Sequence, residues 1–141
     1  MIGVVIVTHG GLAEQLLVTA TNIVGQVKQA KTLSITVGED VDHIRENLSN
    51  AIQSVDTGNG VLILTDMFGG TPSNISLSFL HEKKVEVITG VNLPMLVKVL
   101  TMQDNGDLFA LAKQIEVYGK KNIYLASEIL KSRSKKGSGK S

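Results

Sequence analysis

The chain has 141 residues, of which 43% are hydrophobic and 19% charged, a composition typical of one globular domain and unlike that of a disordered protein. It contains no cysteine, which excludes disulfides and thiolate metal sites. Five of its 14 basic residues lie in the final segment 131–141, which leaves the rest of the chain acidic despite a formal net charge of +1. An acidic body argues against nucleic acid as a partner.

This distribution predicts one domain over residues 1–130 and a basic, disordered tail over 131–141, which is rich in Ser, Gly and Lys. The apolar runs are of strand length, so the sequence predicts no membrane span. Ile2 follows Met1 without the basic region or the small-residue cleavage site of a signal peptide. These features together predict a cytoplasmic protein.

Apolar runs of strand length alternate with segments of helical periodicity along the body of the chain. Continuous β-branched runs predict strands that are buried on both faces, and apolar residues spaced three and four apart predict the helices between them. In chain order we expect strands at 2–7, 32–37, 61–66, 84–90 and 122–129, and helices at 12–27, 41–55, 69–79, 92–100 and within 104–121.

Strands that alternate with helices predict a parallel sheet with helices on both faces. The expected fold class is therefore α/β, as a single-domain, doubly wound and mostly parallel sheet. Segment 122–129 has a mixed pattern and is expected as a C-terminal strand at the sheet edge. With a strand order of 2-1-3-4, the topological switch point lies between the first and third strands.

Polar residues and glycines follow the strands at the edge of the sheet where ligands bind in such folds. The first strand ends at His9 and the third at Asp66, so these two side chains are predicted to face each other. A neutral imidazole is a competent nucleophile, and a carboxylate that accepts its Nδ1–H leaves Nε2 free to attack. The simpler alternatives are a structural histidine and an aspartate that caps the next helix.

The motif GGTPSN follows shortly after the third strand and suits an anion. Its two glycines allow close backbone approach, Thr71 can cap the next helix, and Pro72 suits the first helical turn. Backbone N–H groups at a helix N-terminus favour negative charge. We therefore predict a phosphoryl-binding loop formed by Gly69, Gly70, Thr71 and Ser73.

Other residues have structural interpretations. Asn92 suits a helix start in the same way. We expect Met67 and Phe68 to fill the core under their loop, with contact to a partner protein as the alternative. His43 is expected to be solvated on a helix and His81 to lie near a helix C-terminus, and neither is paired at the spacing of metal ligands.

Three motifs, VTHGGLAEQLL, TDMFGGTPSN and GVNLPMLV, occur in this order over the body of the chain. Together they resemble the IIA component of the mannose family of the bacterial phosphoenolpyruvate:sugar phosphotransferase system. The resemblance implies that Nε2 of His9 accepts a phosphoryl group from the phosphorylated carrier HPr and passes it to a separate IIB component. The IIB component then phosphorylates sugar that enters through the IIC/IID permease, so contact with the membrane is indirect.

The same resemblance implies a protein-to-protein phosphotransferase that needs no metal and no cofactor. It assigns to Asp66 the orientation of His9, and to Thr71 a place near the phosphoryl group. It also implies a homodimer in which an antiparallel C-terminal strand, here 122–129, is exchanged between subunits. The chain departs from some relatives, which have tryptophan at Gly11 or Phe68 and continue into a fused IIB domain.

Two other functions remain open at this point. The phosphoryl-carrying subunit of dihydroxyacetone kinase shares the fold and an early histidine, and a regulatory protein that signals by its phosphorylation state would also use His9. A response-regulator receiver would use Asp66, but it needs an acidic pair after the first strand, where this chain has His9, Gly10 and Gly11. The sugar itself is set by the partner proteins.

Overall fold

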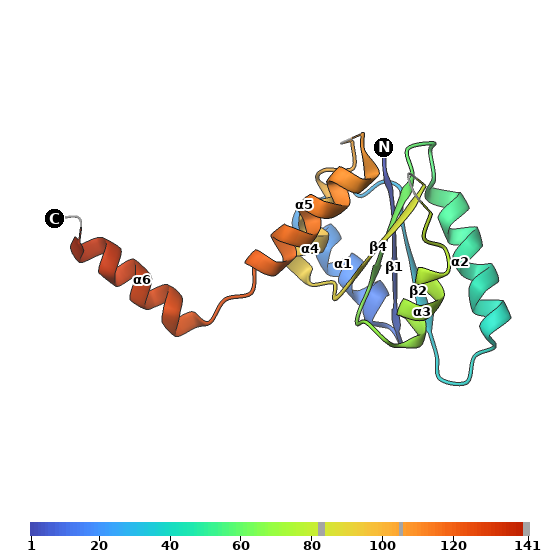
Figure 1. Cartoon of the computed structure of the whole chain (residues 1–141), viewed down its shortest axis with the longest axis horizontal. Coiled ribbons are helices and arrows are strands. Elements are labelled where there is room, and N and C mark those ends of the chain that lie inside the picture. The colour runs from blue at the N-terminus through green and yellow to red at the C-terminus, as the bar shows by residue number, and fades with distance from the viewer. Residues whose placement is uncertain (82–83, 105, 140–141) are drawn as a thin grey trace.

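Four parallel strands form the centre of the molecule, with helices on both faces (Figure 1). This computed structural model describes residues 1–81, 84–104 and 106–139. In chain order its elements are β1 (Gly3–His9), α1 (Leu12–Val24), β2 (Ala30–Ile35), α2 (Val41–Val55), β3 (Val61–Thr65), α3 (Thr71–Leu77), β4 (Val85–Thr89), α4 (Leu93–Leu100), α5 (Leu108–Lys121) and α6 (Ala126–Gly139).

The strand order is β2-β1-β3-β4, and all three pairings are parallel, which confirms the predicted α/β class and the switch point between β1 and β3. Val7 lies opposite Thr65 in the β1–β3 register, so the residues that follow these two strands emerge side by side. Apart from an isolated antiparallel bridge between Val85 and His81, the outer edge of β4 pairs with no strand in the described part of the chain. The fold therefore brings the loops after β1 and β3 together and leaves the outer sides of both edge strands, β2 and β4, without a partner strand in the described part of the chain.

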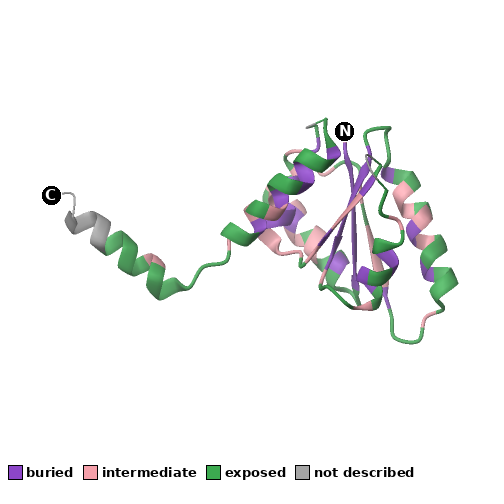
Figure 2. Ribbon diagram, viewed as in Figure 1, coloured by how far each residue is buried: buried purple, intermediate pink, exposed green. Residues whose placement is uncertain are grey.

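Alternate residues of the buried strands face two separate hydrophobic clusters, as the twofold period of a strand requires. Val4 and Ile6 of β1 belong to the cluster with α1, α4 and α5. Val5 and Val7 belong to the cluster with α2 and α3. Figure 2 shows the central strands β1 and β3 almost wholly buried between these two helical layers, whereas the edge strands β2 and β4 are mostly half-buried. This packing fixes the β1 end, and with it the position of His9.

The predicted C-terminal strand is wrong for this single chain. Residues 122–125 leave α5, and α6 extends away from the body as a helix (Figure 1). Its described side chains are exposed except for Ile129, which is half-buried. A strand needs a neighbour for its backbone N–H and C=O groups, and α6 satisfies them internally.

In the structure, α6 continues through residues 131–139 of the predicted tail, and the division into a domain over 1–130 and a tail over 131–141 stays a prediction. Residues 140 and 141 of that tail lie outside the described part. Within the described residues, none of the helices combines the length and apolar character that crossing a membrane requires.

Removing the Ile6 side chain tests the packing that positions β1. Ile6 is fully buried in the cluster with α1, α4 and α5. Ile6→Ala should lower the free energy of unfolding by about 2–5 kcal/mol, because it leaves a cavity in a close-packed core. Val37→Ala is the control, since Val37 is fully exposed and its truncation should cost less than about 0.5 kcal/mol. Urea unfolding followed by circular dichroism measures both, and equal losses would contradict this account of the core.

Candidate functional site

His9 and Asp66, predicted to face each other, are hydrogen-bonded at the carboxyl edge of the sheet. Nδ1 of His9 lies 2.8 Å from Oδ2 of Asp66. The same oxygen accepts the backbone N–H of His9 at 2.9 Å, while Oδ1 accepts the Met67 N–H at 2.9 Å. The ring and the backbone of His9 are therefore both held by one carboxylate.

This contact assigns the tautomer of His9. An ionised carboxylate only accepts hydrogen bonds, so Nδ1 carries the proton of the neutral ring and Nε2 carries the lone pair. The His9 side chain is 48% exposed and that of Asp66 12% exposed. The arrangement therefore presents a nucleophilic nitrogen at the surface, oriented by a carboxylate that is largely shielded from water.

The pKa of Asp66 lies below its ordinary value. Burial alone raises this pKa, but hydrogen bonds from the backbone and ring of His9, attraction to the ring's positive charge and the Met67 N–H together outweigh burial. Asp66 is therefore ionised at neutral pH and able to stabilise a cationic ring.

Two further contacts fix the turn that follows His9. The Oγ1 of Thr8, which is fully buried, accepts the N–H of Ala13 at 2.7 Å and so ties β1 to the start of α1. The N–H of Gly10 donates to the Ile35 carbonyl at 2.9 Å, which ties the turn to the end of β2. Gly10 has a φ of +54°, in the left-handed region that favours glycine. Thr8 could not be singled out from the sequence, where its only local signal is a hydroxyl residue shortly before a glycine turn.

The predicted phosphoryl-binding loop lies beside His9, but its residues differ in what they offer. A Cβ built on Gly70 would lie 2.6 Å from Cε1 of His9, so Gly70 packs directly against the ring. Thr71 is exposed as the first residue of α3, and Gly70, not Thr71 as predicted, is the N-cap. Ser73 is fully buried, backbone and side chain together, and its hydroxyl has no hydrogen-bond partner in the described part of the chain.

Exposed apolar side chains follow the carboxyl ends of β1, β2 and β3, and two of them correct one prediction. Met67 is 56% exposed and Phe68 73% exposed, so neither fills the core under the loop. Leu12, at the start of α1, and Val37, in the β2–α2 loop, are also exposed.

The prediction for Asn92 is confirmed, because its Oδ1 accepts the Met95 N–H at the start of α4. As expected, His43 is exposed.

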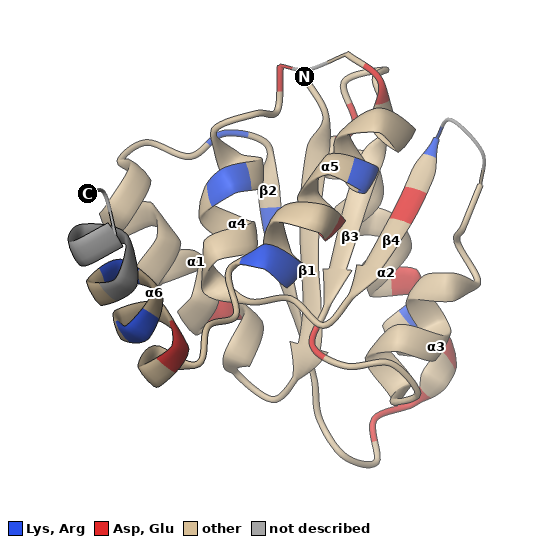
Figure 3. Ribbon diagram, turned by 60° about the vertical axis from the view of Figure 1, so that its left-hand side comes forward, with Lys and Arg blue, Asp and Glu red and all other residues tan. Residues whose placement is uncertain are grey.

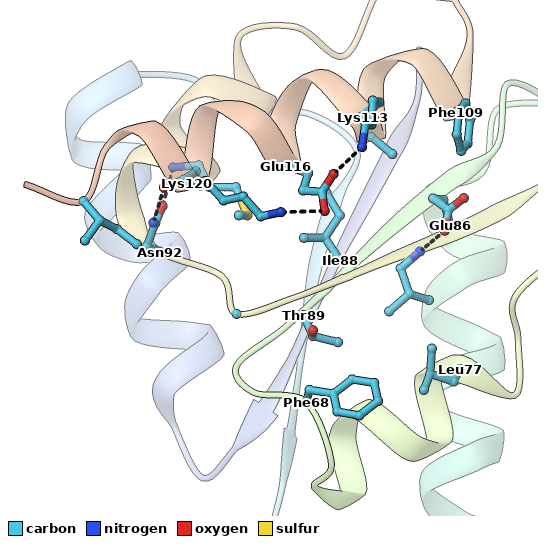
Figure 4. Close-up of a pocket in the computed structure, with 16 residues that line it drawn as sticks. Phe68, Leu77, Glu86, Ile88, Thr89, Asn92, Phe109, Lys113, Glu116 and Lys120 are labelled. Carbon is cyan, nitrogen blue, oxygen red and sulfur yellow. Dashed lines mark hydrogen bonds and ion pairs between the residues drawn. The ribbon is translucent and has the colours of Figure 1, made fainter.

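A groove of about 540 Å³ runs along the open edge of β4 (Figure 4). Leu77 of α3 and Phe68 lie on one side of the groove, opposite Phe109 and the ion-paired residues of α5. In α5, Glu116 pairs with Lys113 at 3.0 Å and with Lys120 at 3.3 Å. The groove is therefore apolar along the α3 side, and α5 lines it with both apolar and charged groups.

Basic residues are not concentrated on the sheet edge that carries His9. Figure 3 shows Lys and Arg on several elements, including α5 and the extended α6. In the described part of the chain, three or more His, Cys, Asp or Glu side chains do not gather into a cluster that could hold a metal ion.

The fold and the site together define a class of protein: a doubly wound α/β domain that presents a histidine, oriented by a carboxylate, at the switch point of its sheet. The family model described as "PTS system fructose IIA component" matches residues 3–116 of this chain. The chain therefore belongs to the mannose family of IIA components of the sugar phosphotransferase system.

Two relatives that are themselves components of the phosphotransferase system support this assignment. The mannose-specific EIIAB component of Escherichia coli K12 is 38% identical over 109 residues, which are 77% of this chain and 34% of that protein. The chain thus spans about a third of that relative. The fructose-specific EIIA component of Bacillus subtilis is 30% identical over 131 residues, 92% of this chain and 90% of the relative.

Solved structures agree with the fold. A phosphotransferase system component EIIA from Streptococcus agalactiae has a TM-score of 0.82 at 25% identity and covers 91% of this chain and 99% of its own. A PTS IIA protein associated with the fucose utilization operon of Streptococcus pneumoniae has a TM-score of 0.81 at 28% identity, with coverages of 91% and 95%.

The lowered pKa of Asp66 predicts a pH-dependent contribution to stability. The stability that the ionised carboxylate adds is complete above the unfolded pKa of about 3.9, and it is lost as the pH falls through the lower pKa of the folded protein. At pH 7, Asp66→Asn should lower the free energy of unfolding by about 1–3 kcal/mol.

Urea unfolding of both proteins between pH 7 and pH 3 measures this contribution. The gap between wild type and Asp66→Asn should narrow at the acid end. A gap that stays constant over this range would mean that the charge of Asp66 adds no stability.

Proposed function

We propose that this chain carries a phosphoryl group on Nε2 of His9, accepts it from phosphorylated HPr and passes it to a separate IIB component. One observation carries the proposal. Nδ1 of His9 is bonded to an ionised Asp66, which leaves Nε2 free on a side chain that is 48% exposed. The family assignment supports a role in the sugar phosphotransferase system.

The transfer is an in-line displacement at phosphorus. The Nε2 lone pair of His9 forms the new N–P bond as the N–P bond of the donor phosphohistidine breaks, and the donor nitrogen leaves with that electron pair. Because Nδ1 keeps its proton, the phosphorylated ring of His9 is cationic, and the Asp66 carboxylate stabilises this cation through the 2.8 Å contact. Transfer to IIB runs by the same step in reverse.

The loop after β3 supplies the groups that stabilise the transferring phosphoryl group. Its candidates are the exposed hydroxyl of Thr71 and the backbone N–H groups of Gly69 and Gly70, whereas Ser73 is buried and could donate only if the loop moves. Fixed hydrogen-bond donors of this kind stabilise negative charge in the transition state without reorganisation. On this proposal the chemistry requires neither a metal nor a cofactor.

The exposed apolar residues around His9 suit contact with protein partners. Leu12, Val37, Met67 and Phe68 are exposed on the loops and the helix start that follow β1, β2 and β3, and His9 itself is half-exposed, so a phosphohistidine on another protein can reach Nε2. Donor and acceptor would use the same face in turn. The protein would work in the cytoplasm and meet the membrane only through the IIC/IID permease that its IIB partner serves.

Phosphorylation by purified donors tests the proposal. After incubation with phosphoenolpyruvate, enzyme I and HPr, intact-mass analysis should find one acid-labile phosphoryl group on the wild type. The His9→Ala variant should carry none. Absence of label on the wild type, with donors shown to be active on another acceptor, would contradict the proposed function.

Two controls sharpen this test. Asp66→Asn should fold and accept phosphate slowly, because an amide donates where the carboxylate accepts and no longer fixes the tautomer of His9. Transfer from the labelled protein should reach a IIB component. Transfer to a kinase subunit instead would favour the dihydroxyacetone kinase alternative.

We also propose that the chain forms a homodimer in which segment 122–129 of one subunit pairs antiparallel with β4 of the other. The groove beside β4 supports this pairing, because an unpaired strand edge is a template for another strand. Ile123, Tyr124 and Leu125 are more than 60% exposed in the single chain and would be covered in the groove. In the dimer the start of α6 would change from helix to strand.

Two truncations test the dimer. Removing residues 122–141 should give a monomer, because it removes the exchanged segment, whereas removing only 131–141 should leave a dimer. Sedimentation velocity measures both against the full chain. A monomeric full chain, or a dimer that survives the longer truncation, would contradict strand exchange.

A further inference from the structure

We propose that Gly70 is a positioning residue for His9, and that the absence of a side chain at position 70 allows the imidazole to keep its bond to Asp66. The inference rests on the proposed role of His9 as the phosphoryl acceptor. It assigns to Gly70 a function separate from donating its N–H to a phosphoryl group.

The backbone at position 70 does not itself require glycine. Gly70 has φ −89° and ψ 174°, an extended conformation that any residue adopts. Its neighbour Gly69 has a φ of +94°, which does favour glycine. Glycine at position 69 is therefore explained by the backbone conformation. Glycine at position 70 is not, and its presence there needs another physical explanation.

That reason is the space that His9 occupies. A Cβ added to Gly70 would lie 2.6 Å from Cε1 and 3.0 Å from Nε2 of His9. Carbon atoms in contact prefer separations of about 3.5–4.0 Å, so a methyl group at this position requires the ring or the loop to move. The close atoms include the nitrogen that would attack phosphorus.

The loop is fixed on its own side. The carbonyl of Gly70 accepts the Asn74 N–H at 2.9 Å at the start of α3. Pro72, which is buried, has its Cδ 3.7 Å from the same added Cβ. A methyl group at position 70 therefore cannot withdraw without disturbing the first turn of α3.

The ring is the part that can yield. One hydrogen bond to Asp66 holds the imidazole, and nearly half of the His9 side chain is open to solvent. Displacing the ring outward lengthens or breaks the Nδ1 contact, and the tautomer is then no longer fixed. Gly70→Ala should therefore weaken the nucleophile by separating His9 from Asp66.

Gly70→Ala and the matched control Gly11→Ala test this inference. Gly11 also adjoins the site and has φ −84°, and a Cβ built on it would meet no heavy atom within 4 Å. Phosphoramidate, a small phosphoryl donor that needs no docking surface, labels accessible histidines. Its N–P bond breaks with loss of ammonia as the bond to Nε2 forms.

We expect phosphoramidate to label Gly70→Ala about 10²-fold more slowly than wild type, because the ring loses the carboxylate that fixes its tautomer and stabilises the cation formed on attack. Labelling of Gly11→Ala should stay within about twofold of wild type. In ¹⁵N NMR the His9 ring of Gly70→Ala should lose the pattern of the Nδ1–H tautomer, which Gly11→Ala should retain. A wild-type labelling rate or a wild-type ring pattern in Gly70→Ala would overturn the inference.

A second measurement uses stability alone and holds even if Gly70→Ala folds poorly. Gly70→Ala should lower the melting temperature when His9 is present and lower it much less in the His9→Ala background, because the clash is then gone. An equal loss in both backgrounds would overturn the inference. If phosphoramidate labels wild type but HPr does not, the proposed function fails, while the ring pattern and the stability comparison still decide the role of Gly70.

Discussion

The carboxylate of Asp66 accepts three N–H groups, and the geometry of the site depends on this convergence. Two of them belong to His9, the backbone N–H and the ring, and the third belongs to Met67. One side chain thus links the end of β1 to the loop after β3 and fixes the tautomer of the imidazole. Because these donors also keep the pKa of Asp66 low, the carboxylate stays charged where a cationic ring needs it.

Most of the fold, and the central pair of the site, could be predicted from the sequence. Buried β-branched runs separated by helical periodicity specify a parallel sheet, and such sheets place ligands at the carboxyl ends of their strands. His9 and Asp66 stand at the ends of the two strands that adjoin the switch point, so the strand order alone predicts that their side chains are neighbours. Their pairing follows from a rule about strand order.

Features that depend on distance or on a partner could not be predicted in this way. Phe68 is apolar and would be expected in the core, but the path of the loop after β3 exposes it, and the residue types of a loop do not determine that path. The sequence indicates only a turn at Gly70, and the structure is needed to show that the His9 ring packs against it. Segment 122–129 is ambiguous for a deeper reason, because its residues 126–129 satisfy their backbone groups within α6 in the single chain, whereas a strand satisfies them only beside another strand.

The link between His9 and Asp66 spans 57 positions in the chain. It exists only when β1 has paired with β3, a contact that forms across the intervening α1, β2 and α2. On a ribosome, a nascent chain would expose His9 long before Asp66 and Gly70 emerge. Its imidazole would remain an ordinary one until the third strand is in place. On the proposed function, competence to take up phosphate would therefore appear only after β3 has been made and paired, as a property of the assembled sheet and not of its first strand.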